Sequence, residues 1–168
     1  MAYNYHDIDD GLRANLLTLE ELQEVGIIKQ QLNLVLSNYP DLKGRRLHKE
    51  LVRSLINVTI YDLIETTLEN IKQHGIKTLE DVKNAPTLVS YSEEMYNSQR
   101  ELKKFLHKNL YKHSSVMQLR FKAANIIRAL FNAFMSEELL LPNQFRVRVP
   151  EDGLHRVVAD YISGMTDS

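Results

Sequence analysis

The stretch GRRLHKELVRSLINVTIYDLIETTLENIKQHG, residues 44–75, decides the fold class of this chain. Its apolar residues recur at helical spacing from Leu47 to Ile71, which is the pattern of an amphipathic α-helix. His74 and Gly75 follow as a C-terminal cap, because glycine readily accepts the left-handed backbone at a helix end. A helix of about thirty residues is long for a globular protein, so we expect it to cross the whole domain or to serve an oligomer contact.

Helical spacing also predicts the elements on both sides of this stretch. Thr18 and Glu21 have the spacing of a capping box, in which each side chain satisfies a free amide at the start of a helix. Ser92 is a further candidate N-cap. The helix that it begins should face inward with Met95, Leu102, Phe105, Leu106 and Leu110. We expect an all-α, multi-helix domain with at most one short strand or hairpin. The predicted helices cover approximately residues 3–14, 18–39 with a bend near Gly26, 78–85, 92–111, 116–135 and 150–165.

The last third of the chain carries three further expectations. Residues 116–135 are apolar around more than one stripe, so this helix should be mostly buried. Arg146 and Arg148 alternate with apolar residues, which predicts an extended segment over residues 144–149. The apolar residues that should dock the final helix on the core are Val157, Val158, Tyr161 and Ile162.

Length and composition narrow the class of protein. The 168 residues make a single domain of ordinary size, and a net charge of −1 argues against a globally basic nucleic-acid binder. The chain has no cysteine, which excludes disulfides and thiolate metal sites. No apolar run approaches the roughly 20 residues that a membrane span needs. We therefore expect a cytoplasmic protein with no membrane partner.

A cluster of polar residues lies in the first predicted helix. Helical spacing places Tyr3 and Asp7 on one face, and His6 and Asp10 on the next. One interpretation is a solvated acidic helix. A second is a metal site built from His6, Asp7 and Asp10, although three or four ligands normally come from more than one element. A third is a ligand-binding face, because a phenol and a carboxylate suit a sugar hydroxyl. The residues alone do not separate these interpretations.

A basic cluster begins the long helix. Arg45, Arg46, His48, Lys49 and Arg53 lie in its first turns, where cations oppose the helix dipole. A bound anion or an acidic partner surface would explain this placement, and so would a solvated basic face. Nucleic-acid binding would also draw on this cluster, but the nearly neutral net charge counts against it.

Common catalytic and nucleotide-binding motifs are missing from the sequence. There is no P-loop, no GxGxxG and no GxSxG nucleophile elbow. Lys103 and His107 have the spacing of an ordinary exposed helix face. Composition and spacing alone thus define only a helical domain with polar patches.

Four blocks, taken in order, nevertheless resemble one known family. AYNYHDIDDGLR at residues 2–13 and RVVADYISGMTD at residues 156–167 resemble the deoxyguanosinetriphosphate triphosphohydrolase family of the HD superfamily. NLYKH at residues 109–113 and KAANIIRALF at residues 122–131 resemble the same family. The resemblance implies a helical fold of HD-superfamily type. It also implies hydrolysis of a deoxynucleoside triphosphate to the deoxynucleoside and inorganic triphosphate, with a divalent metal, Mg or Mn.

The metal ligands of that family are not found in this sequence. In the family pattern the last aspartate ligand lies in a block resembling Asp-x-Ile-Ala-Tyr, which by register with Met1-Ala2-Tyr3 falls two positions before Met1. The other ligands, a His and a His-Asp pair, lie further upstream, so His6-Asp7 does not match that pair. We expect this chain to be the C-terminal portion of such an enzyme, with no catalytic residue and no metal ligand, and to be inactive alone.

The resemblance assigns substrate contacts to five residues. Tyr3 and Asp7 match residues that pack under the deoxyribose and hydrogen-bond to it. Tyr111 and His113 match a segment near the base. Lys103 matches a basic contact to the phosphates. These residues would form one wall of the substrate pocket.

The family also implies an assembly. Its members form homo-oligomers, often hexamers, and some hold a second, regulatory nucleotide between subunits, for which Arg45, Arg46 and Arg53 are the candidates here. The alternative function is a non-catalytic helical module for oligomerisation or regulatory nucleotide binding. The long helix at residues 45–73 favours this alternative.

Overall fold

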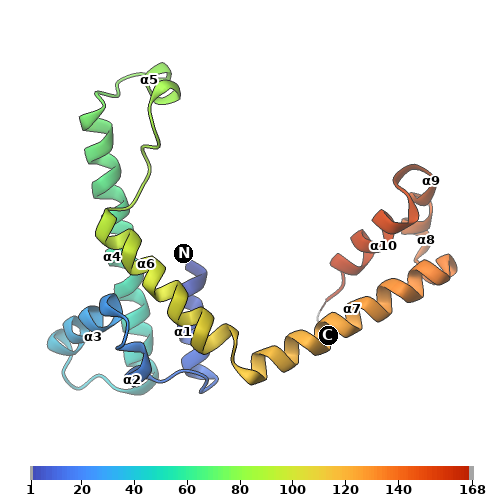
Figure 1. The fold of residues 1–168 in the computed structure, drawn as a ribbon, viewed down its shortest axis with the longest axis horizontal. Coiled ribbons are helices and arrows are strands. Elements are labelled where there is room, and N and C mark those ends of the chain that lie inside the picture. The colour runs from blue at the N-terminus through green and yellow to red at the C-terminus, as the bar shows by residue number, and fades with distance from the viewer. Residues whose placement is uncertain (1, 167–168) are drawn as a thin grey trace. The chain divides into compact units, whose positions relative to one another are not determined.

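The computed structural model describes residues 2–166, and every regular element in that range is helical (Figure 1). The expected all-α fold is confirmed. Asp167, the last residue of the C-terminal resemblance block, lies outside the described residues. The elements are α1 (Ala2–Arg13), α2 (Leu19–Leu22), α3 (Gly26–Asn38), α4 (Gly44–Gln73), α5 (Leu79–Asn84), α6 (Glu93–Leu106), the π-helical η1 (His107–Tyr111), α7 (Ser114–Ser136), the 3-10 helix η2 (Glu138–Leu140), α8 (Asn143–Arg146), α9 (Val149–Asp152) and α10 (Leu154–Ser163).

The chain divides into two compact units. Unit 1 comprises Met1–His113 and unit 2 comprises Ser114–Ser168. Each has its own cluster of buried apolar side chains. The expectation of a single domain over residues 1–168 stays a prediction, and each unit is described by itself.

The helix starts in unit 1 follow the capping signals of the sequence. The Thr18 hydroxyl accepts from the Glu21 amide at 3.2 Å, and the Glu21 carboxylate accepts from the Thr18 amide at 2.8 Å. This capping box confirms the predicted helix start. The helix was expected to continue through Gly26, but α2 ends at Leu22, and Val25 is extended before α3 begins. Leu22 and Val25, on either side of this break, are both buried.

The core of unit 1 is formed by α1, α3, the first half of α4, and α6. Helix α4 packs against α1 and α3, and α6 also contacts α1. The apolar residues predicted to face inward on α6 are buried as expected. The buried core residues of α1, α4 and α6 with η1 include Tyr5, Ile8, Leu12, Leu47, Leu51, Leu55, Met95, Leu102, Phe105, Leu106 and Leu110.

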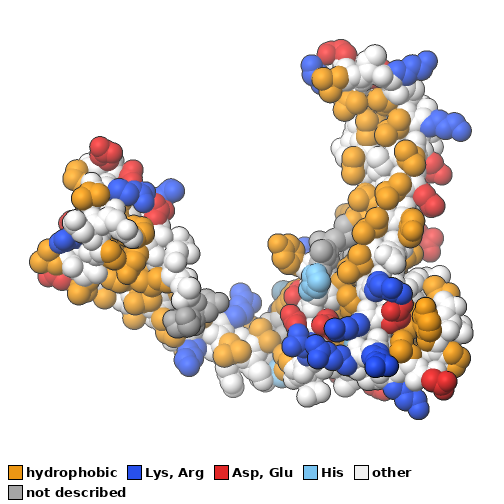
Figure 2. All heavy atoms as spheres, turned by 180° about the vertical axis from the view of Figure 1, so that it is seen from behind, with side chains coloured by type: hydrophobic (Ala, Val, Ile, Leu, Met, Phe, Trp, Pro, Cys, Tyr) orange, Lys and Arg blue, Asp and Glu red, His pale blue; other side chains and the backbone are white. Residues whose placement is uncertain are grey.

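Helix α4 crosses the core with its first half only. Its buried residues end at Thr59, whereas Tyr61 and Leu68 beyond it are exposed. We call the part of α4 beyond Thr59 the arm, and Figure 2 shows hydrophobic side chains along it. The Asn70 amide donates to the Leu88 carbonyl at 2.9 Å and to the Ser90 hydroxyl at 3.0 Å, which ties the returning chain to the arm. The oligomer contact expected for α4 stays a prediction.

Unit 2 is built on the packing of α10 against α7. Its buried residues are Phe134, Leu141, Val157 and Val158. The Tyr161 ring packs against Phe134 and Phe145, with centroids 5.2 and 4.8 Å apart. Ile162 packs on the same cluster, so the expected docking of the last helix is confirmed.

Three expectations for the C-terminal third were wrong. Helix α7 is not mostly buried: only Phe134 is, while Leu119 and Phe121 are 67% and 69% exposed. Within unit 2, the main elements packed on α7 are α10 and η2, so much of its apolar circumference has no covering element.

Residues 144–149 are helical or turn residues and are not extended. Pro142 precedes α8, and Pro150 lies in the first turn of α9, where its fixed φ is tolerated. The final helix was expected as one element from Pro150. It is broken at Gly153, whose φ of +82° is accessible to glycine, so α10 begins at Leu154. None of the described helices is both long and apolar enough to cross a membrane.

Candidate functional site

The first feature of the site is a contact between two residues that lie 104 positions apart. The Tyr111 hydroxyl of η1 donates a hydrogen bond to the Asp7 carboxylate of α1. Both side chains are half-buried. Burial, and then the hydrogen bond to Asp7, raise the pKa of Tyr111 to about 12. The phenol therefore stays protonated near neutral pH and can act as a donor.

A π turn places Tyr111 at this position. Residues His107–Tyr111 continue α6 as a π-helix, a local form that is frequent at functional sites. Within this turn Leu110 is buried, and a Cβ added to Gly11 of α1 would lie 2.8 Å from the Leu17 Cδ1 and 3.3 Å from the Leu110 Cδ1. The absence of a side chain at Gly11 thus leaves room for both leucines, and through Leu110 it lets η1 approach α1 closely. This approach brings Tyr111 to Asp7.

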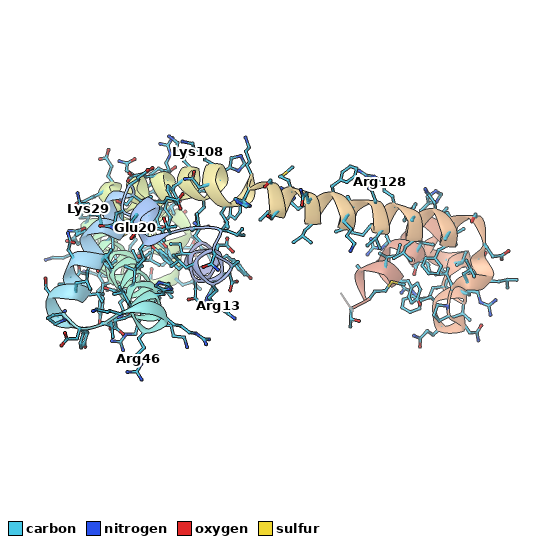
Figure 3. All side chains as sticks on the ribbon, turned by 90° about the horizontal axis from the view of Figure 1, so that it is seen from below. Arg13, Glu20, Lys29, Arg46, Lys108 and Arg128 are labelled. Carbon is cyan, nitrogen blue, oxygen red and sulfur yellow. The ribbon has the colours of Figure 1, made fainter. Side chains whose placement is uncertain are left out.

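A cationic groove adjoins the pair. We call it the α6 groove; its volume is about 470 Å³, and it is lined by Arg100, Lys103, Lys104, His107 and Tyr111. The imidazole of His107 meets the Tyr111 ring edge-on, with centroids 6.4 Å apart. Three basic side chains and an imidazole therefore line the same groove as the Tyr111 phenol, which contacts Asp7. Lys108, labelled in Figure 3, is exposed on the same helix end and does not line the groove.

The structure brings together three of the five predicted substrate residues. Asp7 and Tyr111 are in direct contact, and Lys103 lines the α6 groove with Tyr111. Tyr3 is 82% exposed, on the same helix as Asp7. His113 follows the π turn, is half-buried, and its amide donates to the Leu110 carbonyl at 3.0 Å. The substrate roles of all five residues stay predictions.

The other polar residues of α1 do not assemble a metal centre with Asp7. His6 and Asp10 are exposed, and Asp10 pairs with Arg13 at 3.5 Å. Among residues 2–166, no three His, Cys, Asp or Glu side chains lie close enough together to hold a metal ion. The residues described here do not fit the divalent metal that the family resemblance implies, so we derive no step through it.

The basic cluster of α4 lies on the surface. Arg45, Arg46 and Arg53 are all exposed. The Arg53 guanidinium donates to the Glu50 carboxylate, which offsets part of its charge. The predicted role of this cluster in holding a second nucleotide stays a prediction.

Sequence reasoning did not assign His107 or Arg100 to the site. A signal for His107 was present: Lys103, His107 and Tyr111 follow one another at a spacing of four residues, which forms a row along a helix. Arg100 had no such signal. Arg100 lies one helical turn before Lys104 on α6 and lines the groove. Its guanidinium also lies over the Tyr96 ring, 5.9 Å from the ring centroid.

Comparison with known proteins gives two findings. Residues 89–168 match the phosphohydrolase-associated domain. This match covers α6, η1 and all of unit 2, and so includes the α6 groove.

The relatives that this chain matches share one name. Proteins named deoxyguanosinetriphosphate triphosphohydrolase-like from Thiobacillus denitrificans, Bordetella pertussis and Nitrosomonas europaea are 47%, 46% and 44% identical to this chain over 167 residues. These matches cover 99% of this chain but only 43–44% of the relatives. The resemblance to the deoxyguanosinetriphosphate triphosphohydrolase family is thus confirmed along the whole chain. The chain spans less than half the length of the curated relatives it matches.

Proposed function

We propose that this chain is part of a deoxynucleoside triphosphate triphosphohydrolase and supplies one wall of its substrate pocket. The observation that carries the proposal is the position of the Asp7–Tyr111 pair at the end of the cationic α6 groove. A deoxynucleoside triphosphate has an anionic chain on one side and a sugar with hydroxyl groups on the other. The cationic α6 groove matches the anionic chain, and the Asp7–Tyr111 pair beside it matches the sugar.

The groove suits the phosphate chain. Lys103, Lys104 and Arg100 provide positive charge, and His107 adds a ring nitrogen that can donate or accept. Because these side chains come from successive turns of one helix, their charges lie in a row along the groove. An extended triphosphate is a ligand of that shape and charge.

The Asp7–Tyr111 pair suits the sugar. The Asp7 carboxylate can accept a hydrogen bond from a ribose hydroxyl, and the Tyr111 phenol stays protonated near neutral pH. Because the Tyr111 phenol already occupies the Asp7 carboxylate, the site has little room for the 2′-hydroxyl of a ribose. The pair therefore favours a deoxyribose. Tyr3 and His113 would complete this wall on the sugar and base sides.

Catalysis would require groups that this chain does not assemble. The relatives are more than twice as long, and the described residues form no metal centre. We therefore propose that the chain alone does not release triphosphate. Release of inorganic triphosphate from dGTP with Mn²⁺, by a preparation free of any longer enzyme, would refute this part of the proposal.

The pocket is tested in a chimera in which this chain replaces the matched 167 residues of the Thiobacillus denitrificans relative. A hydrogen bond to a charged group contributes about 1.5–3 kcal/mol, so Asp7→Asn and Lys103→Met should each lower kcat/KM by roughly 10- to 150-fold. The matched controls are Asp10→Asn and Lys108→Met, which remove the same charges at exposed positions outside the site. Equal effects of site and control variants would refute the proposed pocket.

Equilibrium binding tests the chain by itself. Titration calorimetry with dGTP should show weaker binding for Lys103→Met than for Lys108→Met, because only Lys103 lines the groove. Binding that is the same in both variants would place the triphosphate elsewhere.

A second candidate function is an oligomerisation module, and unit 2 favours it. An open groove of about 990 Å³ runs between α7 and α10, with Leu119, Ile126, Ile127 and Phe131 in its lining. Exposed apolar surface of this kind is typical of interfaces. We propose that the intact protein forms a homo-oligomer. Sedimentation velocity over a hundredfold concentration range tests this, and a monomer throughout would refute it. A cytoplasmic location, and the absence of nucleic-acid binding, stay predictions.

A further inference from the structure

A buried hydrogen-bond network joins three helices in the core of unit 1. The Tyr5 hydroxyl of α1 lies 2.5 Å from the Thr59 hydroxyl of α4, and the Gln99 amide of α6 donates to the Tyr5 hydroxyl at 2.6 Å. Tyr5 and Thr59 are almost completely buried. Sequence analysis did not single out any of these three residues.

The direction of each hydrogen bond follows from the available protons. The Thr59 hydroxyl donates its only proton to the Leu55 carbonyl at 2.8 Å. It must therefore accept from Tyr5, which in turn accepts from Gln99. Longer contacts accompany these bonds, because the Gln99 amide also lies 3.5 Å from both the Thr59 hydroxyl and the Met95 sulfur. The Gln99 Oε1 atom is buried and has no hydrogen-bond partner among residues 2–166. A buried polar group that loses its partner is costly, which makes the network a strict constraint on how the helices meet.

Two residues of the network lie on the elements that carry the functional pair: Tyr5 lies on α1 with Asp7, and Gln99 lies on α6, which η1 continues to Tyr111. Tyr5 precedes Asp7 by two residues and therefore points to the other side of α1. Gln99 precedes Lys103 by one turn and begins the row that continues through His107. A rotation of α1 about its axis would break the contact of Tyr5 with Gln99. The same rotation would carry Asp7 away from Tyr111.

We propose that Tyr5, Thr59 and Gln99 are positioning residues, whose network fixes the rotation of α1 against α6 and thereby holds Asp7 at Tyr111 at the end of the α6 groove. Packing alone constrains this rotation less, because apolar contacts have no preferred direction. The use of the Asp7–Tyr111 pair in substrate binding rests on the proposed function. The positioning of the pair by the network does not.

The test measures the Tyr111 hydroxyl in Tyr5→Phe, which keeps the ring and removes the hydroxyl. Protein labelled with ¹³C at tyrosine Cζ is examined by NMR at pH 10.5, and Tyr111→Phe assigns the signal. With a pKa of about 12, set first by burial and then by the hydrogen bond to Asp7, about 3% of Tyr111 is ionised at this pH. A phenol released both from Asp7 and from its half-buried position has the ordinary pKa of about 10 and is about 75% ionised. We expect a large rise in ionisation in Tyr5→Phe, and no change in the matched control Tyr61→Phe, which alters an exposed residue of α4.

Two further variants keep the proposal testable if Tyr5→Phe does not fold. Thr59→Val is nearly isosteric, and Gln99→Met keeps the length of the side chain. Circular dichroism at pH 10.5 selects the variants that remain folded. Raised ionisation of Tyr111 in the folded variants supports the proposal, and unchanged ionisation in them overturns it.

The chimera separates this inference from the proposed function. Tyr5→Phe should lower kcat/KM in the wild-type background and have little further effect when Asp7→Asn is already present, because the network acts through Asp7. If Tyr111 ionisation rises but nucleotide turnover is unchanged, the positioning holds and the proposed pocket is wrong. If turnover falls by the same factor in both backgrounds, the network does not act through Asp7 and the positioning is refuted.

Discussion

Helix α4 offers a direct comparison between a core position and an arm position of one helix. Leu51 is completely buried, whereas Leu68, seventeen residues further along, is 60% exposed. Both leucines occupy helical positions, so replacement by alanine changes helix propensity equally in the two variants. The difference between them therefore reports burial alone.

The expected magnitudes differ by several-fold. Leu51→Ala removes a side chain from a closed core and should lower the free energy of unfolding by about 2.5–5 kcal/mol. Leu68→Ala removes a side chain that water already reaches, and surface substitutions usually change stability by less than about 0.5 kcal/mol. With a urea m-value of about 1–3 kcal/mol/M, the first variant should shift the unfolding midpoint by roughly 1–5 M, and the second by less than about 0.5 M.

Urea titration monitored by circular dichroism at 222 nm measures both midpoints at the same protein concentration. The pair should be repeated at a tenfold higher concentration, because a self-association that covers the arm would make the cost of Leu68→Ala concentration-dependent. Similar midpoint shifts for the two variants at low concentration would refute the division of α4 into a core half and an exposed arm.

Three further predictions concern single interactions. Thr18→Ala should lower the free energy of unfolding by about 1 kcal/mol, measured by urea titration, whereas Thr18→Ser should restore it; equal losses would show that the cap hydroxyl is unimportant. The hydrogen bond from Arg148 lowers the pKa of Asp160, so its stabilising effect is present above the unfolded pKa of about 3.9 and lost as pH falls through the folded pKa. The thermal midpoint of the wild type should therefore fall more steeply below pH 4 than that of Asp160→Asn, and parallel curves would contradict this. The raised pKa of Tyr111 has the opposite sign, because its folded state favours the neutral phenol. The stability it contributes is complete below about pH 10 and is lost between about pH 10 and 12, so the wild type should lose more of its thermal midpoint over this range than Tyr111→Phe does.

The sequence alone determined several helix ends of unit 1 and the resemblance to a family. The capping box at Thr18 and the end of the long helix at His74 were read directly, because each depends on groups within a few residues of one another. The inward row on α6 was also predicted, since a helix as amphipathic as this one has one face that can be buried. The resemblance that the four blocks indicated agrees with a relative that is 47% identical over 99% of this chain.

Burial in unit 2 was not predictable in the same way. The apolar pattern of α7 shows which faces could be buried, but not whether an element exists to cover them. The alternation of Arg146 and Arg148 has the period of a strand, yet these residues lie in short helices and a turn, where Arg148 pairs with both Asp152 and Asp160. Periodicity shows which face of a helix is apolar. That face is buried only where another element packs against it.

The site shows the same division most clearly. The sequence, through its resemblance to a family, named Asp7, Tyr111 and Lys103 separately. Only the tertiary structure placed the Tyr111 phenol on the Asp7 carboxylate across 104 positions, and only it assembled Tyr5, Thr59 and Gln99 from three helices. The physical reason is that hydrogen bonds act over about 3 Å, so their partners are chosen by how the helices pack, and no local pattern in the chain records that choice.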